Sequence, residues 1–446
     1  MTKPRIATRA RIKHAGVGLA LLAVLAGSIG TLYMSDAPLV RTIAVGSHPV
    51  RVIVSTRTER AFVIHGGTSA GTISMLDTRT GTLIRTLIVG ADPRSLGSAV
   101  VVPQTARLFF INDHTPSGGP GVVTMFDAHS GRFLRAVPVG YLPEAAVVDE
   151  QSGRVFVLNQ NNALGQNHAT ISVLDAESGQ VVGHIAVGQN LNQLPNANAL
   201  AIDGRHNRIL ASVASTENGA ALDIVDAKSG ALVQSRATGQ FAESIVTDEQ
   251  TGHAFVVGGA GISMFDTTNG KLLHYAAVGR SLNVRDAVVN RRTARLYVLS
   301  LDWSNNGTIT SSGHVFILDS RKGTILRTLT VSWPTSMAID ELTGHIFITS
   351  SGPQDASGTL AGAGNLDVFD GLTGAVLQTI PIGVSPESVS VDSRTRHVLV
   401  ANYGGTVRVT DRWAWIPKGL RHWLPFLPLA STRNDSGSIS MFTLAH

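Results

Sequence analysis

The sequence contains no cysteine. Disulfide bonds, thiolate metal sites, cysteine nucleophiles and a lipid-modified N-terminal cysteine are therefore excluded. Charged residues are also few, at 15%, whereas hydrophobic residues make up 43% of the chain and 46 of its 446 residues are glycine. This composition is typical of a packed, turn-rich globular protein and argues against disorder.

The chain carries no excess charge outside its first residues. Five of its 36 basic residues lie within residues 1–14, which hold no acidic residue. The remaining 31 basic residues are equal in number to the 31 acidic residues, so the rest of the chain is formally neutral. Domains that bind nucleic acids usually carry a clear excess of positive charge. We therefore expect no nucleic-acid partner.

Residues 15–34, AGVGLALLAVLAGSIGTLYM, follow this basic flank without a single charge. The run is longer than a signal-peptide core of roughly 7–15 residues and matches a membrane span of roughly 20. SDA at 35–37 would serve as a cleavage site, but Pro38 directly after it disfavours cleavage. We expect a signal anchor in the inner membrane of a bacterial envelope, with residues 1–14 cytoplasmic and the rest of the chain periplasmic. The alternative is a cleaved signal peptide and a secreted periplasmic protein.

A repeat of roughly 50 residues runs through the rest of the chain. Seven aspartates each end a short alternating apolar run, and each is followed four residues later by a glycine. The aspartates are Asp77, Asp127, Asp175, Asp226, Asp266, Asp319 and Asp370. An aspartate side chain caps a tight turn and glycine takes the positive-φ position, so each match predicts a β-hairpin. Two further strands precede each hairpin, as in EAAVVDEQSGRVFVLN at 144–159. Each repeat is thus a four-stranded antiparallel sheet, and such sheets pack radially into an all-β propeller.

The two ends of the repeat region complete each other. Residues 39–46, LVRTIAVG, match the fourth strand LIRTLIVG at 83–90, but no first three strands precede them. SISMF near the C-terminus matches a third strand, and no fourth follows it. Pairing strand 39–46 with strand 438–444 makes one split blade and removes the open edges of the ring. The sequence predicts eight blades within a single domain at 39–446, and seven blades are the alternative.

The repeat resembles the YVTN-family β-propeller repeat, through RVFVLN, RLYVLS and HVLVAN followed by segments such as TISVLDAESGQVVGHIAVG. The resemblance covers residues 39 to about 411 and again 438–444. It implies a propeller fold and an exported location, and most members resemble binding or structural modules. Propellers of the quinoprotein amine dehydrogenase and cytochrome d1 type are similar in strand pattern, and that similarity implies a redox or enzymatic alternative.

Ligands of propellers usually bind at the channel mouth, where the first strand of each blade begins. Counting back from the residue that ends each first strand aligns one position per blade. The candidate ligand-binding residues are Arg94, Glu144, Asn198, Glu243, Arg285, Thr335 and Glu387, with Val50 at the same position of the first blade. Three carboxylates and two guanidinium groups around one channel would suit a small polar ligand, or a metal bound through oxygen atoms. The alternative is a solvated channel with no ligand.

Five histidines, His48, His65, His114, His168 and His314, fall in loops expected on the same face. They come from different blades and lack the local spacing of a metal motif. We therefore predict no metal site, no cofactor and no catalytic residues.

The last blade is interrupted by an insertion, predicted at 412–437, that contains WAWIPKGLRHWLPFLPLA at 413–430. Its aromatic residues Trp413, Trp415, Trp423 and Phe426 would suit contact with a protein partner or the membrane interface. A segment that folds onto its own blade is the alternative.

Taken together, the sequence favours a membrane-anchored propeller that acts as a binding or assembly scaffold. The alternative is an enzyme or redox module of the quinoprotein type with its site at the channel mouth.

Overall fold

The computed structural model describes residues 40–66, 70–91, 99–112, 119–160, 169–188, 196–215, 219–238, 242–259, 261–278, 282–303, 309–352, 362–409 and 431–444. Regular structure in these ranges consists of β-strands, and no helix in them is long and apolar enough to cross a membrane. The predicted signal anchor at 15–34 lies outside the described residues.

Seven four-stranded antiparallel sheets form in chain order, each from consecutive strands. Blade 1 comprises β2 (Pro49–Ser55), β3 (Arg60–His65), β4 (Ala70–Asp77) and β5 (Leu83–Ala91); blade 2, β6 (Ala99–Val102), β7 (Arg107–Asn112), β8 (Val122–Asp127) and β9 (Phe133–Pro138); blade 3, β10 (Pro143–Asp149), β11 (Arg154–Asn159), β12 (Ala169–Asp175) and β13 (Val181–Val187); blade 4, β14 (Asn196–Asp203), β15 (Arg208–Ser215), β16 (Gly219–Asp226) and β17 (Leu232–Ala237). Blade 5 comprises β18 (Ser244–Asp248), β19 (His253–Gly258), β20 (Gly261–Asp266) and β21 (Leu272–Ala277); blade 6, β22 (Leu282–Asn290), β23 (Arg295–Trp303), β24 (Ile309–Asp319) and β25 (Ile325–Ser332); blade 7, β26 (Pro334–Ile339), β27 (His345–Ser350), β28 (Asn365–Asp370) and β29 (Val376–Pro381).

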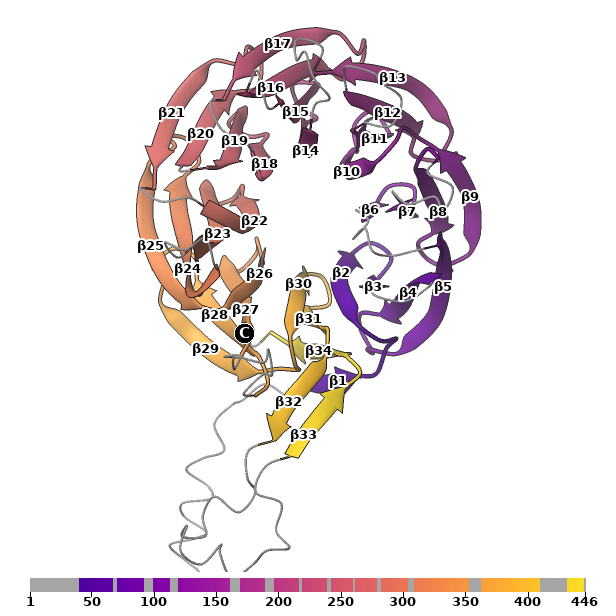
Figure 1. Cartoon of the computed structure of the whole chain (residues 1–446), viewed down its shortest axis with the longest axis vertical. Helices are drawn as coiled ribbons and strands as arrows, with labels where there is room; N and C mark the ends of the chain where they lie inside the picture. Colours follow the sequence, from indigo (N-terminus) through magenta and orange to yellow (C-terminus); the bar gives the residue numbers. More distant parts are fainter. Residues whose placement is uncertain are drawn as a thin grey trace, which may run out of the picture. The chain divides into compact units, whose positions relative to one another are not determined.

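The eighth blade joins the two ends of the chain. Its strands are β30 (Pro386–Asp392), β31 (His397–Asn402), β34 (Ser438–Thr443) and β1 (Arg41–Ile43), in that order from the channel outwards. β1 pairs antiparallel with β34, with Thr42 opposite Ser440. The innermost strand of each blade contacts that of the next, and β30 contacts β2, so the ring closes (Figure 1). The predicted eight blades and the predicted closure are confirmed.

The repeated aspartate and glycine form the hairpin turns that the sequence predicts. In blade 3, the carboxylate of Asp175 accepts hydrogen bonds from the amide and the hydroxyl of Ser178, both at 2.7 Å. Gly179 follows with a φ of +70°, a conformation that costs residues with a Cβ about 1–2 kcal/mol. The other six matched glycines also have positive φ. The spacing of four residues is therefore set by the geometry of one turn.

The core lies between the blades. Within the described ranges, buried apolar side chains form eight clusters, one at each junction of adjacent blades. The third residue of the second strand is a fully buried aromatic in six blades: Phe62, Phe109, Phe156, Phe255, Tyr297 and Phe347. A blade buries both of its faces only against two neighbours, so the ring must close for every blade to be covered.

Hydroxyl groups also bond across some junctions, at the ends of the first strands. Thr78 of blade 1 donates to Asp392 of blade 8 at 2.6 Å, and Thr267 of blade 5 donates to Asp203 of blade 4 at 2.5 Å. Both aspartates are fully buried, so they need such donors. The aspartates that end these first strands thus accept hydrogen bonds that join adjacent blades.

An additional hairpin interrupts blade 8. β32 (Gly405–Val409) pairs with β33 (Ser431–Asp435) as a separate two-stranded sheet between β31 and β34. Figure 1 shows this hairpin beside the ring and outside the eight sheets. The predicted contact residues Trp413, Trp415, Trp423 and Phe426 lie outside the described residues.

Candidate functional site

β-bulges mark the channel mouth. In six blades the pairing of the first two strands skips one residue near the start of the innermost strand. The skipped residues are Val50, Glu144, Asn198, Arg285, Thr335 and Glu387, all of which the sequence places at the mouth. A bulge leaves one residue unpaired and re-aims its side chain. The predicted mouth position is therefore a distinct backbone feature, repeated around the ring.

Strained residues fix the chain just before four of these bulges. His48, Leu142, Trp333 and Ser385 each precede a proline, and their φ angles lie between 48° and 53°. Such a conformation costs a non-glycine residue about 1–2 kcal/mol. In each case the carbonyl accepts an amide hydrogen bond from the residue that follows the second strand, as Ser351 donates to Trp333 at 2.9 Å. These bonds hold the strained turns and so fix where the bulge begins.

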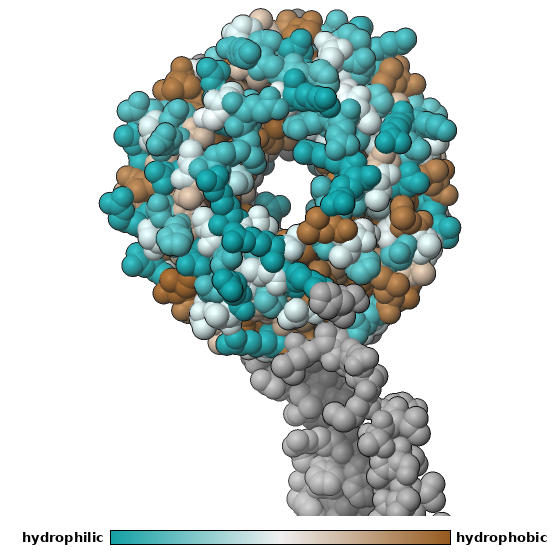
Figure 2. Space-filling model, turned by 180° about the vertical axis from the view of Figure 1, so that it is seen from behind, coloured by the Kyte–Doolittle hydropathy of each residue, from teal (hydrophilic) through white to brown (hydrophobic). Residues whose placement is uncertain are grey.

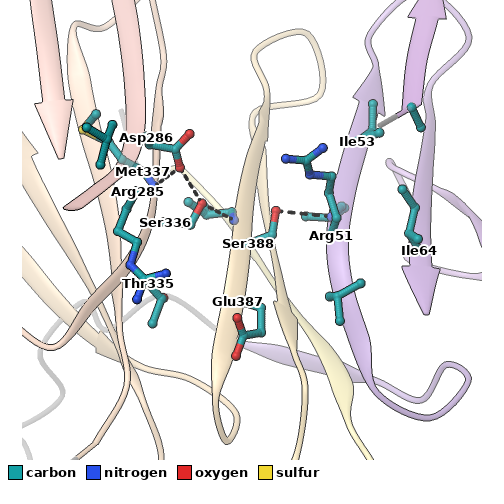
Figure 3. Close-up of a pocket in the computed structure, with 15 residues that line it drawn as sticks. Arg51, Ile53, Ile64, Arg285, Asp286, Thr335, Ser336, Met337, Glu387 and Ser388 are labelled. Atoms are coloured by element: carbon teal, nitrogen blue, oxygen red, sulfur yellow. Dashed lines mark hydrogen bonds between the residues drawn. The ribbon is translucent and has the colours of Figure 1, made fainter. Parts of the chain in front are cut away.

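A cavity of about 560 Å³ lies at the mouth, between the innermost strands of blades 6, 7, 8 and 1. Figure 3 shows polar side chains from opposite walls pointing into it. Its polar lining consists of Arg51, Arg285, Asp286, Thr335, Ser336, Glu387 and Ser388. Bulge residues and their successors line it together, because the bulge interrupts the alternation of a regular strand.

Hydrogen bonds between neighbouring blades hold this wall together. Ser336 of blade 7 donates its hydroxyl to Asp286 of blade 6 at 2.9 Å, and the amide of Met337 donates to the same oxygen at 2.8 Å. On the other side, the amide of Val52 in blade 1 donates to the hydroxyl of Ser388 in blade 8 at 3.3 Å. Burial raises the pKa of Asp286, while the Met337 amide, the Ser336 hydroxyl and Arg51 act in the opposite direction. The cavity is thus a preformed part of the ring.

The charges in the cavity face one another without closing into ion pairs. Arg51, Arg285 and Glu387 are exposed to the lumen. The surrounding channel wall raises the pKa of Glu387 by desolvating it, and Arg285 opposes that shift. Among the described residues, no carboxylate lies within 4 Å of either guanidinium group, and Glu387 likewise has no ion-pair partner within that distance. Both signs of charge are therefore available to a ligand.

The structure brings only some of the predicted residues together. Arg285, Thr335 and Glu387 share the mouth cavity, and they also line an adjoining cavity of about 210 Å³ that includes Trp333. Glu243 does not line either cavity; its carboxylate accepts a hydrogen bond from the Val284 amide at 2.7 Å. Burial raises the pKa of Glu243, and both the Val284 amide and Arg285 lower it.

Of the three other predicted positions, only the side chain of Glu144 is described, and it does not line this cavity. Glu144, on blade 3, accepts a hydrogen bond from Gln160 at 2.9 Å. The side chain of Asn198 and the whole of Arg94 lie outside the described residues. The site as described is therefore confined to one side of the ring, at blades 6, 7, 8 and 1.

The three predicted histidines that the structure describes do not form a shared metal centre. His65 is buried and contacts the hydroxyl of Ser74 at 2.8 Å, and burial lowers its pKa. His314 contacts Asp302 at 3.0 Å, and His48 packs against Tyr403. In the part of the chain that the structure describes, no three His, Asp or Glu side chains come together as a metal site. His114 and His168 lie outside that part.

Sequence reasoning did not identify Arg51, Asp286 or Ser388. Each follows the predicted mouth residue by one position, and a strictly alternating strand would turn it away from the channel. A signal for the bulge was present, since four of the six bulged strands begin with a proline (Pro49, Pro143, Pro334 and Pro386), and proline within a sheet is common at bulges.

A larger cavity of about 920 Å³ at the other end of the first strands was not anticipated either. Three glutamates line it: Glu150, Glu249 and Glu341. Each directly follows an aspartate at the end of a first strand. Glu249 pairs with Arg291 at 3.6 Å and accepts an amide hydrogen bond from Gly204 at 3.2 Å. The channel is open between its two ends, as Figure 2 shows at the centre of the ring.

No family model matches the chain, and no curated protein matches it. Solved structures do resemble it in fold. The quinohemoprotein alcohol dehydrogenase from Comamonas testosteroni has a TM-score of 0.58 and 12% identity, and the match covers 92% of this chain and 76% of that one. A europium-containing methanol dehydrogenase has a TM-score of 0.57 and 11% identity, with 91% and 93% covered. Hydrazine synthase from Kuenenia stuttgartiensis has a TM-score of 0.50 and 16% identity, with 83% and 96% covered. At these identities the likeness shows the fold alone, which is an eight-bladed propeller.

Proposed function

We propose that this protein is an exported, membrane-anchored propeller that serves as a binding or assembly scaffold, with the mouth cavity as its site for a small polar ligand. The observation that carries the proposal is the cavity of about 560 Å³, whose wall is built by bulged strands of four blades. A preformed pocket with a few convergent polar groups is the usual form of a small-molecule site. The resemblance of the repeat to the YVTN family supports an exported binding module.

The anchor and the partner contact belong to the same proposal. Residues 15–34 would hold the protein at the membrane, with the ring on the periplasmic side. The β32–β33 hairpin leaves the ring and brackets the Trp-rich segment. That segment, with Trp413 and Trp423, would supply the surface for a protein partner.

A second candidate function is an enzyme or redox module with its site in the same cavity, and it rests on the likeness in fold to dehydrogenases. The names of those neighbours imply a haem and a europium ion. Attachment of a c-type haem needs two cysteines, and the sequence has none. A hard cation needs several oxygen ligands at one point, and no such group of carboxylates forms among the described residues. The residues present do not fit those two groups, and we derive no reaction step through them.

Molecules retained by the purified protein would test the proposal. The full chain would be purified from the cells that make it, then denatured, and the released small molecules identified by mass spectrometry. Val50→Phe fills the mouth cavity, and Val148→Phe is a matched control because Val148 lines the cavity at the other end of the channel. We expect a polar compound at about one per chain, lost in Val50→Phe and kept in Val148→Phe.

Equal small-molecule content in both variants would contradict the proposal. Visible absorbance and metal content measured on the same preparation address the second candidate. A chromophore or a stoichiometric metal would favour the enzyme over the scaffold.

A further inference from the structure

Two guanidinium groups in the mouth cavity have no acceptor among the described residues. Arg51 reaches into it from β2 and Arg285 from β22, on opposite walls (Figure 3). Throughout the described ranges, neither side chain has a hydrogen-bond acceptor or an ion-pair partner. Arginines elsewhere in the ring do pair, as Arg60 does with Asp77 at 2.9 Å and Arg208 with Asp226 at 2.8 Å. Each free guanidinium offers a fork of N–H donors that matches the geometry of a carboxylate.

A carboxylate in the same cavity also lacks a donor. Glu387 extends from β30 into the cavity that Arg51 and Arg285 also line (Figure 3), and no hydrogen bond to it forms within the described part of the chain. Glu387 and Arg285 are close enough to influence each other electrostatically but do not form an ion pair. Both line the cavity of about 560 Å³, so a molecule bound there could meet a group of each charge.

The balance of charge narrows the ligand class. The cavity is lined by two arginines and two carboxylates, Asp286 and Glu387, so its formal charge is neutral when both acids are ionised. A ligand that carries charge of only one sign would be attracted by one kind of group in the cavity and repelled by the other. A ligand that is neutral overall but carries opposite charges would satisfy both sets of groups.

Trp333 indicates where the positively charged end of such a ligand would lie. It lines the adjoining cavity together with Glu387 and Arg285, and its strained backbone is held by the Ser351 amide. The face of a tryptophan attracts an ammonium group, and a carboxylate beside it adds to that attraction.

We propose that the mouth cavity binds a small zwitterion of the amino-acid type. Its carboxylate accepts hydrogen bonds from Arg51 and Arg285, and its ammonium group donates to Glu387 beside Trp333. This inference rests on the proposed function and names the ligand class for the same site.

Three five-carbon probes separate the charge types at constant length. They are 5-aminopentanoate, which is zwitterionic at pH 7, glutarate, which carries two negative charges, and 1,5-diaminopentane, which carries two positive charges. Isothermal titration of the full chain, stripped of bound small molecules, should show 5-aminopentanoate binding at least tenfold more tightly than either of the other two, because each of those probes loses the charged hydrogen bond at one of its two ends. Stronger binding of glutarate or of 1,5-diaminopentane would overturn the zwitterion while leaving a small-ligand site in place.

Variants that each remove one charged group provide the second part of the test, with the same three probes. Arg285→Ala should weaken 5-aminopentanoate and glutarate roughly tenfold or more and leave 1,5-diaminopentane unchanged, whereas Glu387→Gln should weaken 5-aminopentanoate and spare glutarate. Arg291→Ala, at the other end of the channel, is the matched control and should change none of the three. Equal affinities across these variants would overturn the inference. Absence of binding by all three probes would also overturn it, and the retained-molecule experiment with Val50→Phe would then decide separately whether the proposed function stands.

Discussion

Removal of the last strand should abolish the folded ring. β34 contributes Ile439 and Met441 to the core between blades 8 and 1, and Phe442 to the core between blades 7 and 8, where Leu444 also packs. All four side chains are at most 9% exposed. Burial of one such side chain contributes roughly 1.5–3 kcal/mol, so the four together contribute roughly 6–12 kcal/mol. Domains unfold with a free energy of about 5–15 kcal/mol, so the loss is comparable with the whole stability.

The assay is urea unfolding of the full chain and of a chain that lacks residues 438–446. The deletion also leaves β1 and β31 without their common partner, which opens the ring. Phe442→Ala provides a graded version and should lower the free energy of unfolding by about 3–5 kcal/mol. Thr443→Ala is its control, because Thr443 is exposed at the end of the same strand and its loss should change stability by no more than about 0.5 kcal/mol. A deletion variant that unfolds at the same urea concentration as the full chain would refute the closure argument.

Three further predictions concern the junctions, the turns and the insertion. Thr267→Val removes a donor to the buried Asp203 and should cost roughly 1–3 kcal/mol in urea unfolding, whereas the exposed Thr86→Val should cost almost nothing; equal costs would contradict the role of the junction bond. The Ser178 amide and hydroxyl hold the pKa of Asp175 below its usual value, so the stabilisation is present above the unfolded pKa of about 4 and is lost as the pH falls through the lowered folded-state pKa. Asp175→Asn should therefore lower the urea midpoint at pH 7, and this difference should shrink as the pH is lowered; a difference that persists unchanged in acid would count against this account. Replacing residues 406–434 with a short glycine linker should leave the urea midpoint of the ring unchanged, because the β32–β33 hairpin belongs to none of the eight blades, and a large drop would show that the insertion supports the fold.

The fold could be predicted in detail because its unit is local and repeated. An aspartate such as Asp127, followed after four residues by a glycine with positive φ, defines a turn whatever lies elsewhere in the ring. The split blade was also visible, since residues 39–46 match a fourth strand and the C-terminus ends in a third. Thr443 stands where the other third strands end in the turn aspartate. Closure of the ring followed from these matches, because a third strand from one end of the chain and a fourth strand from the other complete one four-stranded blade.

The site was predicted only in part because its residues depend on bulges and on long-range neighbours. Arg285 and Glu387 were found by aligning one position per blade, and the structure brings them into one cavity. Arg51 and Asp286 were missed because an alternating strand places only one of two adjacent residues at the channel. Which blades share a cavity could not be read from the repeat, since every blade has the same pattern. Asp286 contacts Ser336 across a separation of fifty residues, and only the packing of blade 7 against blade 6 brings the two together.

A crystal structure of the full chain with 5-aminopentanoate at saturating concentration tests the central claim most directly. The account predicts electron density for one molecule in the mouth cavity, with its carboxylate at Arg285 and its ammonium group at Glu387. A mouth cavity that holds only water, with the compound absent or bound at another place on the ring, would contradict it.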